Sequence, residues 1–311
     1  MSTDWNLAAT GLKAEAGTPA ALGKMRSFYW TLRRELWESR SLYLAPLGVS
    51  AVFLMGFAVR AFRLPERMRS LAALGDPMRQ HAEIASAYNI LAGLMMLTGM
   101  VVATFYCLDA LHGERRDGSI LFWKSLPVSD LTTVLAKAAV PLGILPLFVF
   151  AVTFVTQWIM LLLSSAVLAA SGQSVAALWE HLSFFRMSGL LLYHLLTIHA
   201  LWHAPLYAWL LLVSAWARRT PFLWAFLPPI AICYLEKIAF NTTHLLSLLE
   251  YRLQGGMEAL TVEGTFPMDP MTHLTPFRFV STPGLWIGLA ITAAFLGAAV
   301  RLRRDRGPIR Y

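Results

Sequence analysis

The stretch YNILAGLMMLTGMVVATFYCL, residues 88–108, decides the fold class because it holds 21 consecutive residues without a charged side chain. An α-helix needs about 20 predominantly apolar residues to cross a hydrocarbon core about 30 Å thick. An apolar helix in the core of a soluble protein needs no such length. The stretch therefore predicts a transmembrane helix.

Similar apolar stretches recur along the chain and predict an all-α, polytopic membrane helix bundle. The third is longer than one crossing, and Pro141 and Pro146 predict a kink in it. The fifth carries Pro228 and Pro229 and is interrupted by Glu236 and Lys237, so it could be tilted, broken or re-entrant. The six predicted spans cover residues 42–62, 86–108, 131–170, 187–217, 220–240 and 281–302.

The composition agrees with a membrane domain. Hydrophobic residues make up 57% of the chain and charged residues 14%, whereas soluble domains carry about 25% charged residues. We predict a mobile tail at 1–24, one transmembrane domain at 25–307 and a short tail at 308–311. Cys107 and Cys233 lie in or beside apolar stretches, which predicts neither a disulfide framework nor a zinc site.

The basic residues predict the orientation. Six spans place both termini on one side, and 17 of the 26 Lys and Arg residues are cytoplasmic if the termini are, as the positive-inside rule requires. The formal charge of +8 is spread beside the ends of apolar stretches, unlike the basic stripe of a nucleic-acid-binding protein. The segment from Arg60 to Arg79 is an exception, with five arginines on the predicted outer side.

Before the first span, apolar and charged residues alternate at spacings of three and four. Phe28, Leu32 and Leu36 would share a face, with Arg33 and Arg34 among the charged neighbours. The pattern predicts an amphipathic helix in the headgroup layer. An ordinary basic anchor flanking a span fits it equally.

The connection between the second and third spans, LHGERRDGSILFWKSLPVSD at 111–130, is the most informative polar segment. Asp117 or Ser119 could cap a short helix that ends at Pro127, and Ser129 could cap the third span. The apolar run at 120–123 has no core of its own to enter. It therefore needs a lipid surface or a groove on a protein.

This segment resembles the type-two ATP-binding-cassette permeases, whose membrane subunits share a Glu-basic-x-x-Gly-Ser/Thr run followed by Leu-x-x-Pro-Val/Ile-Ser or a close variant and a later lysine. The matching residues here are Glu114, Arg115, Gly118, Ser119, Leu121, Leu126, Pro127, Val128, Ser129 and Lys137. The pair Phe122 and Trp123 and the long third span depart from the pattern. More loosely, the resemblance runs over residues 25–307.

The resemblance implies a coupling helix that docks into a separate ATPase subunit. The implied docking residues are Glu114, Arg115, Gly118, Leu121, Phe122, Trp123, Leu126 and Pro127. It also implies two ATPase copies, a second permease copy or homologue, and residence in a bacterial cytoplasmic (inner) membrane. The chain would then be a transporter subunit that exports its cargo, and the residues leave lipid-like molecules, peptides, drugs and polysaccharide all open as that cargo.

Nucleotide binding is expected in the partner. The sequence contains no Gly-x-x-x-x-Gly-Lys-Ser/Thr phosphate loop, the motif that cradles nucleotide phosphates in P-loop proteins. We therefore expect no cofactor in this chain, no catalytic residue and no metal ligand, with ATP and magnesium bound by the ATPase subunit.

Several polar or small residues within the apolar stretches are candidates for function or packing. His199 and His203 are four apart on one predicted helix face, and the spacing predicts that His194 is rotated away from it. Structural or pathway-lining roles are the simplest interpretation, and a membrane enzyme using all three histidines is the alternative. A third possibility is a non-transporting anchor or sensor for an ATPase.

Further candidates lie in the last third of the chain. Glu236 could mark an outer membrane interface or contact a substrate. Gly284 and Gly288 allow a close helix contact, either within the chain or between two copies. In the long connection 241–283, residues 245–253 predict an amphipathic helix, and 175–185 predicts a shorter one.

Overall fold

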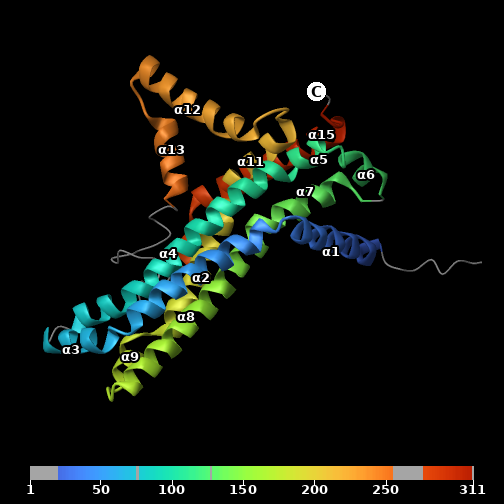
Figure 1. The fold of residues 1–311 in the computed structure, drawn as a ribbon. Coiled ribbons are helices and arrows are strands. Elements are labelled where there is room, and N and C mark those ends of the chain that lie inside the picture. The colour runs from blue at the N-terminus through green and yellow to red at the C-terminus, as the bar shows by residue number, and fades with distance from the viewer. Residues whose placement is uncertain (1–19, 75–76, 127, 255–275, 310–311) are drawn as a thin grey trace, which may run out of the picture.

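The structure is a computed structural model that describes residues 20–74, 77–126, 128–254 and 276–309. Every regular element within those ranges is a helix, as Figure 1 shows. Six helical stretches are long and apolar enough to cross a membrane: Ser41–Ala61, Glu83–Arg116, Asp130–Ala170, Phe184–Trp202, Pro221–Phe240 and Pro283–Asp305. The chain is thus an all-helical, multi-pass membrane protein, which confirms this part of the prediction.

The helices follow one another with short connections. The first half contains α1 (Ala20–Glu38), α2 (Ser41–Ala61), α3 (Leu64–Leu74), α4 (Pro77–Ala110), α5 (His112–Arg116), α6 (Ile120–Ser125), α7 (Asp130–Ala139), the π-helical segment η1 (Val140–Ile144) and α8 (Leu145–Ala170). The second half contains α9 (Ala176–His181), α10 (Phe184–His194), the π-helical segment η2 (Leu195–Trp202), α11 (Ala204–Trp216), α12 (Pro221–Phe240), α13 (His244–Leu253), α14 (Pro276–Ser281) and α15 (Pro283–Asp305).

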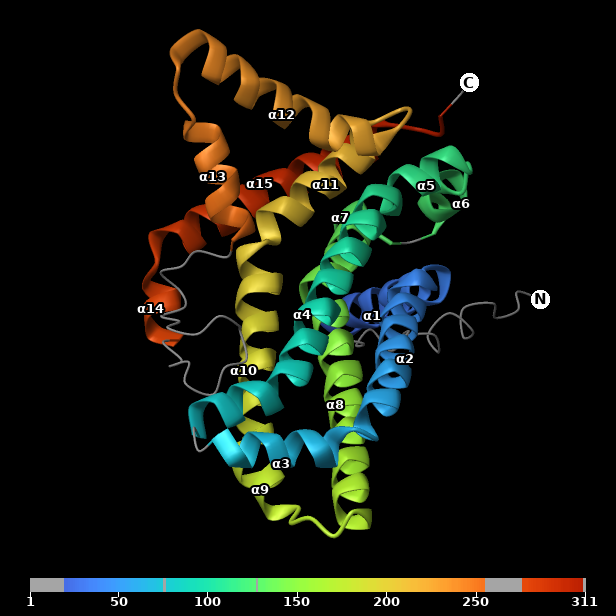
Figure 2. The same cartoon turned by 60° about the vertical axis from the view of Figure 1, so that its left-hand side comes forward.

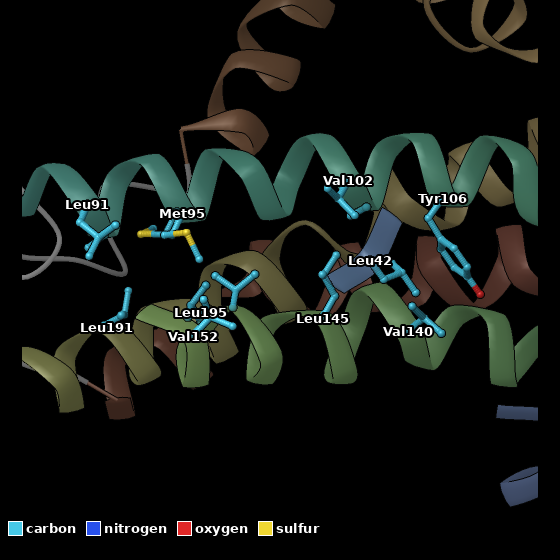
Figure 3. Packing of buried hydrophobic residues seen from close by; sticks show 14 of the residues in the cluster. Leu42, Leu91, Met95, Val102, Tyr106, Val140, Leu145, Val152, Leu191 and Leu195 are labelled. Carbon is cyan, nitrogen blue, oxygen red and sulfur yellow. The ribbon is translucent and has the colours of Figure 1, made fainter. Parts of the chain in front are cut away.

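The second, third and fourth spans form the centre of the bundle. Their most apolar stretches are 44%, 44% and 56% buried, against 11% for the first span and 6% for the fifth. Figure 3 shows Leu91 and Met95 of α4 facing Val152 of α8 and Leu195 of η2 across this core. Both α4 and α8 carry large apolar side chains around their circumference, as expected of helices that lie at the centre of a bundle.

The third span departs from a regular α-helix near its two prolines, and the departure is a π-helical segment. Ser129 accepts a hydrogen bond from the Thr132 amide at 3.1 Å, which confirms the predicted N-cap. Pro141 then falls within η1, and Pro146 begins the first turn of α8. Proline has no amide proton to donate, and a wider π-helical turn accommodates the missing bond.

The fourth predicted span, 187–217, is divided in two. The π-helical segment η2 continues α10 and ends at Trp202. His203 separates it from α11, whose first turn contains Pro205. The segments η1 and η2 pack against each other, so both departures from regular α-helix lie side by side in the bundle. Such π-helical insertions often occur at functional sites.

The fifth span is one continuous helix in spite of Pro228 and Pro229. Only Ala225 of α12 is buried. In Figures 1 and 2, α12 leaves the bundle and α13 returns toward it. Helix α12 contacts α4, α11 and α13. The left-handed backbone of Asn241, with φ of 51°, makes the turn between them.

The helix predicted over 245–253 corresponds to α13, and the one over 175–185 corresponds in part to α9. A large part of the connection 241–283, residues 255–275, lies outside the described residues.

The two ends of the bundle carry different short helices. At one end, α3 and α9 lie close together, and the Gln173 side chain at the end of α8 donates to the Pro65 carbonyl at 2.8 Å. At the other end lie α1, α5, α6 and the C-terminal part of α15. The two ends of the described chain therefore lie on the same side of the bundle. The predicted tail at 1–24 falls largely outside the described residues.

Candidate functional site

The helices α5 and α6 form a bent element at one end of the bundle. Gly118 joins them with φ of +73°, a left-handed conformation that glycine adopts without the steric cost of a side chain. Of the two predicted caps, Ser119 occupies the N-cap position of α6 but makes no capping bond, and its hydroxyl donates to the Glu114 carbonyl at 3.4 Å. The Asp117 carboxylate accepts from the Arg116 side chain at 2.9 Å. The predicted stop residue Pro127 lies outside the described residues.

Glu114 on α5 lies at the centre of a buried ion network. One carboxylate oxygen accepts from Arg34 at 3.0 Å and lies 3.1 Å from the Lys137 ammonium. The other oxygen accepts from Arg303. These three cations come from α1, α7 and α15, so the single carboxylate of Glu114 connects α5 to three other helices.

A second acidic residue, Glu35 on α1, shares two of these cations. Both of its carboxylate oxygens accept from the Lys137 ammonium at 2.9 Å, and Arg34 donates to one of them at 2.7 Å. The Tyr106 hydroxyl of α4 donates to the same carboxylate at 3.1 Å. Lys137 is only 2% exposed and Glu35 3%. Burial at this level is tolerated because each charge has direct partners.

Asp130 completes the network by accepting from Arg303 at 3.0 Å. Arg34 also pairs at 3.5 Å with Glu38, which is 50% exposed and lies at the edge of the cluster. Apart from Glu38, the cluster contains three acidic and three basic side chains. We call the six residues the ion network: Glu35, Glu114, Asp130, Arg34, Lys137 and Arg303.

Arg115, also on α5, binds the end of α11 and the segment that follows α15. Its guanidinium donates to the Ala215 and Ala217 carbonyls at 2.6 and 3.2 Å, at the end of α11. The Arg115 carbonyl accepts from the Ile309 amide at 3.0 Å. The Ser214 hydroxyl accepts from the amides of Leu111 and His112 at 3.0 and 2.9 Å. α5 is therefore held from both sides.

One face of α6 packs against the bundle, and the other face is exposed. Ile120 is fully buried, whereas Leu121 and Phe122 are 61% and 59% exposed. Trp123 lies under Arg34, whose guanidinium carbon is 3.7 Å from the ring centroid. Lys124 donates to the carbonyls of Arg304 and Arg306 at 3.1 and 3.0 Å. The Phe122 ring packs edge-on against Trp123, with centroids 4.8 Å apart, and the apolar pair Leu121 and Phe122 remains largely exposed.

The predicted docking residues thus fall into two groups. Leu121, Phe122 and, to a lesser degree, Leu126 are exposed. Glu114 and Arg115 are buried, so they hold the element in place and offer no surface to a partner. The sequence interpretation missed the roles of Glu35 and Arg303. Lys137 gave a usable signal, since a lone charge beside an apolar stretch requires a partner.

The three histidines lie closer together than their spacing predicts. The ring centroids of His194 and His199 are 6.0 Å apart, and those of His199 and His203 are 5.6 Å apart. The prediction that His194 turns away is wrong, because π-helical winding brings residues five apart onto one face. Within the described ranges, no group of three or more His, Cys, Asp or Glu side chains could hold a metal ion.

Each ring nitrogen of His203 faces a backbone carbonyl. Nδ1 is 2.8 Å from the Ile198 oxygen, and Nε2 is 3.3 Å from the Leu253 oxygen. His203 thereby links the end of η2 to the end of α13.

Glu236 is a helix cap. Its carboxylate accepts from the amides of His244 and Leu245 at 2.7 and 2.9 Å and from the Thr242 hydroxyl at 2.9 Å. These amides belong to the first turn of α13, where negative charge is favourable. The residue therefore fixes the turn between α12 and α13.

Gly284 and Gly288 make room for α13 within the same chain. A Cβ atom on Gly288 would lie 2.6 Å from Arg252, and one on Gly284 would lie 3.2 Å from Tyr251. Arg252 donates to the Gly284 carbonyl and stacks over Trp202, 4.5 Å from the ring centroid. Burial lowers the pKa of Arg252 from its usual value. Of the two predicted uses of these glycines, the intrachain contact is the one present here.

Comparison with known proteins identifies no relative. No family model matches the sequence, and no curated protein or solved structure is similar to it. The resemblance to type-two permeases therefore rests on the sequence alone, chiefly on the motif between Glu114 and Lys137.

Proposed function

We propose that this chain is the membrane-spanning permease subunit of an ATP-binding-cassette exporter whose ATPase is a separate polypeptide. One observation carries the proposal: α6 exposes Leu121 and Phe122 while α5 beneath it is bonded to helices from both ends of the chain. An exposed apolar pair on a short, firmly held helix suits a groove on a partner protein.

The ion network supports a role in transmitting movement. A force on α6 passes through Glu114 to Lys137 at the start of the third span and to Arg303 at the end of the sixth. It also passes through Arg115 to the end of α11. A rigid element bonded to several spans moves them together when its docking surface moves.

In this proposal, two ATPase subunits bind ATP and magnesium, and their closure moves α6. A second permease copy or homologue completes the transport path, and the cargo leaves the cytoplasm. The chain itself catalyses no reaction. It lies in the cytoplasmic (inner) membrane of a bacterium with both termini inside, and α1 rests in the headgroup layer with Trp30 and Trp37 exposed.

The test is affinity purification of the full chain from its native host, with partners identified by mass spectrometry. We expect an ATPase to co-purify with the unaltered chain and with Phe62→Ser. Phe62 is 79% exposed at the other end of the bundle and serves as the control. Leu121→Ser with Phe122→Ser is expected to abolish co-purification. Absence of any ATPase, or its retention by this double variant, would refute the proposal.

A transport measurement separates an exporter from a non-transporting anchor or sensor. Vesicles containing the co-purified complex should accumulate cargo extracted from the host when ATP is added, and should fail to do so with a non-hydrolysable analogue. ATP hydrolysis without accumulation of any compound would favour the anchor. For the membrane enzyme, the histidines offer no supporting metal cluster among the described residues.

A further inference from the structure

A pocket lies at the end of the bundle opposite α6, beside α3. Its volume is about 300 Å³, and it opens between α2, α3 and α4, with the ends of α8 and α9 behind them. The wall is mostly apolar and includes Phe57, Met68, Ile84 and Leu178. The charged lining residues are exposed, whereas the apolar lining residues are at least partly buried. The pocket therefore has an apolar interior and a charged rim.

The rim carries a positive charge. Arg60, Arg63 and Arg67 line the pocket together with one acidic residue, Glu83. Glu83 pairs with Arg67. Among the residues that the structure describes, neither Arg60 nor Arg63 has an acidic partner within 4 Å. Two guanidinium groups are thus available for an anion, and their forked donors match phosphate oxygens.

A buried hydroxyl at the pocket wall also needs a partner. Tyr88 is only 3% exposed, and the polar group beside its hydroxyl is the Ser164 side chain on the same pocket wall. The two side chains do not meet in good hydrogen-bond geometry, so the Tyr88 hydroxyl lacks a well-placed partner among the described residues. Phe57 packs edge-on against the Tyr88 ring, with centroids 6.3 Å apart, and holds it beside the pocket. Because buried polar groups nearly always have partners, the Tyr88 hydroxyl points to a ligand with polar atoms.

We infer that this pocket binds a phosphate-bearing anionic lipid. The phosphate lies between Arg60 and Arg63, the glycerol and ester oxygens reach the Tyr88 hydroxyl, and one acyl chain covers Phe57, Met68 and Ile84. A free phosphate ion would satisfy the arginines and leave the apolar wall in contact with water. An uncharged lipid would cover the wall and leave the guanidinium groups unpaired.

Membrane placement agrees with this ligand. Arg60 belongs to the last turn of the apolar helix α2, and Arg63 follows it before α3 begins. The pocket mouth therefore lies where a spanning helix leaves the hydrocarbon, at the depth of lipid headgroups. The same ligand accounts for Arg60 and Arg63, two of the five arginines that 60–79 carries on the side where the charge rule expects few. The inference stands whether or not α6 binds an ATPase.

The experiment is native mass spectrometry of the full chain released from detergent and titrated with dioleoyl-phosphatidylglycerol. The first lipid adduct gives an apparent dissociation constant. We expect tighter binding of phosphatidylglycerol than of dioleoyl-phosphatidylcholine, whose choline neutralises the phosphate. Arg60→Gln with Arg63→Gln should weaken the first adduct about tenfold or more, because two charge-assisted hydrogen bonds are lost. Tyr88→Phe should weaken it about threefold, because one neutral hydrogen bond is lost.

The matched control is Arg301→Gln with Arg304→Gln, two exposed arginines at the opposite end of the bundle. This control should leave the first adduct unchanged, and the melting temperature of all variants should match the unaltered chain. Equal binding of the two lipids, or an equal loss in the control, would overturn the inference. Displacement of the lipid by a moderate excess of inorganic phosphate would also overturn it, because the site would then be one for the free anion.

Discussion

The Lys137 ammonium lies 2.9 Å from both carboxylate oxygens of Glu35, and the two side chains are almost fully buried. This contact joins α1, which precedes all the spans, to the first turns of the third span. Because Glu114 lies 3.1 Å from the same ammonium, the lysine also reaches α5. Lys137 of α7 therefore links α1 and α5.

Removal of this lysine is expected to destabilise the protein strongly. Lys137→Met leaves Glu35 and Glu114 with Arg34 as the one cation that they still share. Breaking a buried ion pair from one side costs about 3 to 5 kcal/mol. The midpoint of unfolding by a denaturing detergent measures the loss. In the double variant with Glu35→Gln, the cost should be smaller than the sum of the two single costs. Strict additivity would contradict a direct interaction.

Ser214→Ala tests the attachment of α5 to α11. The Ser214 hydroxyl accepts from the Leu111 and His112 amides, and both donors lose their partner in the variant. Buried amides without partners cost about 1 to 3 kcal/mol each, so we expect a clear fall in the free energy of unfolding.

The matched control for Ser214 is Ser188→Ala. Ser188 is also buried in a span, but its hydroxyl donates only to the Phe184 carbonyl of its own helix. That carbonyl keeps its place in the helix, so the control should change the unfolding free energy little. A comparable loss in both variants would show that Ser214 does not hold α5.

Gly118→Ala probes the bend between α5 and α6. A left-handed conformation costs a residue with a side chain about 1 kcal/mol relative to glycine. The variant should increase hydrogen exchange of the α6 amides and leave the core of the bundle unchanged. Gly189→Ala is the control, because Gly189 has a helical backbone and open space around it. Equal exchange in the two variants would argue against a conformational role for Gly118.

The spans could be predicted because a bilayer imposes a length. Uncharged runs such as 88–108 have no other stable environment, so their count and approximate limits follow from composition. The π-helical segments could not be predicted. Pro141 indicates only that a hydrogen bond is missing in the third span, and the packing of η1 against η2 decides how the backbone accommodates it.

The partners within the ion network could not be predicted from the sequence either. Glu114 meets Arg34 across 80 residues of chain and Arg303 across 189. Its local motif resembles a docking surface, and only the fold determines that the carboxylate turns inward. In the apolar run 120–123, the prediction of exposure is confirmed for Leu121 and Phe122 and is wrong for Ile120, which is fully buried. A six-residue helix packed on a bundle buries one face and exposes another.

Gly288→Ala tests whether the small residues of α15 serve α13. The added methyl group would lie 2.6 Å from the Arg252 guanidinium, closer than real Cβ atoms approach other atoms, so this end of the side chain must shift from its place over Trp202. We expect faster hydrogen exchange across α13, because Arg252 is its only buried residue. Overpacking of this kind costs about 1 to 3 kcal/mol.

Gly297→Ala on the same helix is the control, with no atom within 4 Å of the added methyl group. Alanine there should be neutral or stabilise α15 by up to about 1 kcal/mol, since it favours helix over glycine. If Gly288→Ala instead left α13 unchanged and reduced association between two copies, the glycines would serve a dimer contact. If Gly288→Ala lowers the free energy of unfolding and Gly297→Ala raises it, Gly288 is required by the side chain of Arg252.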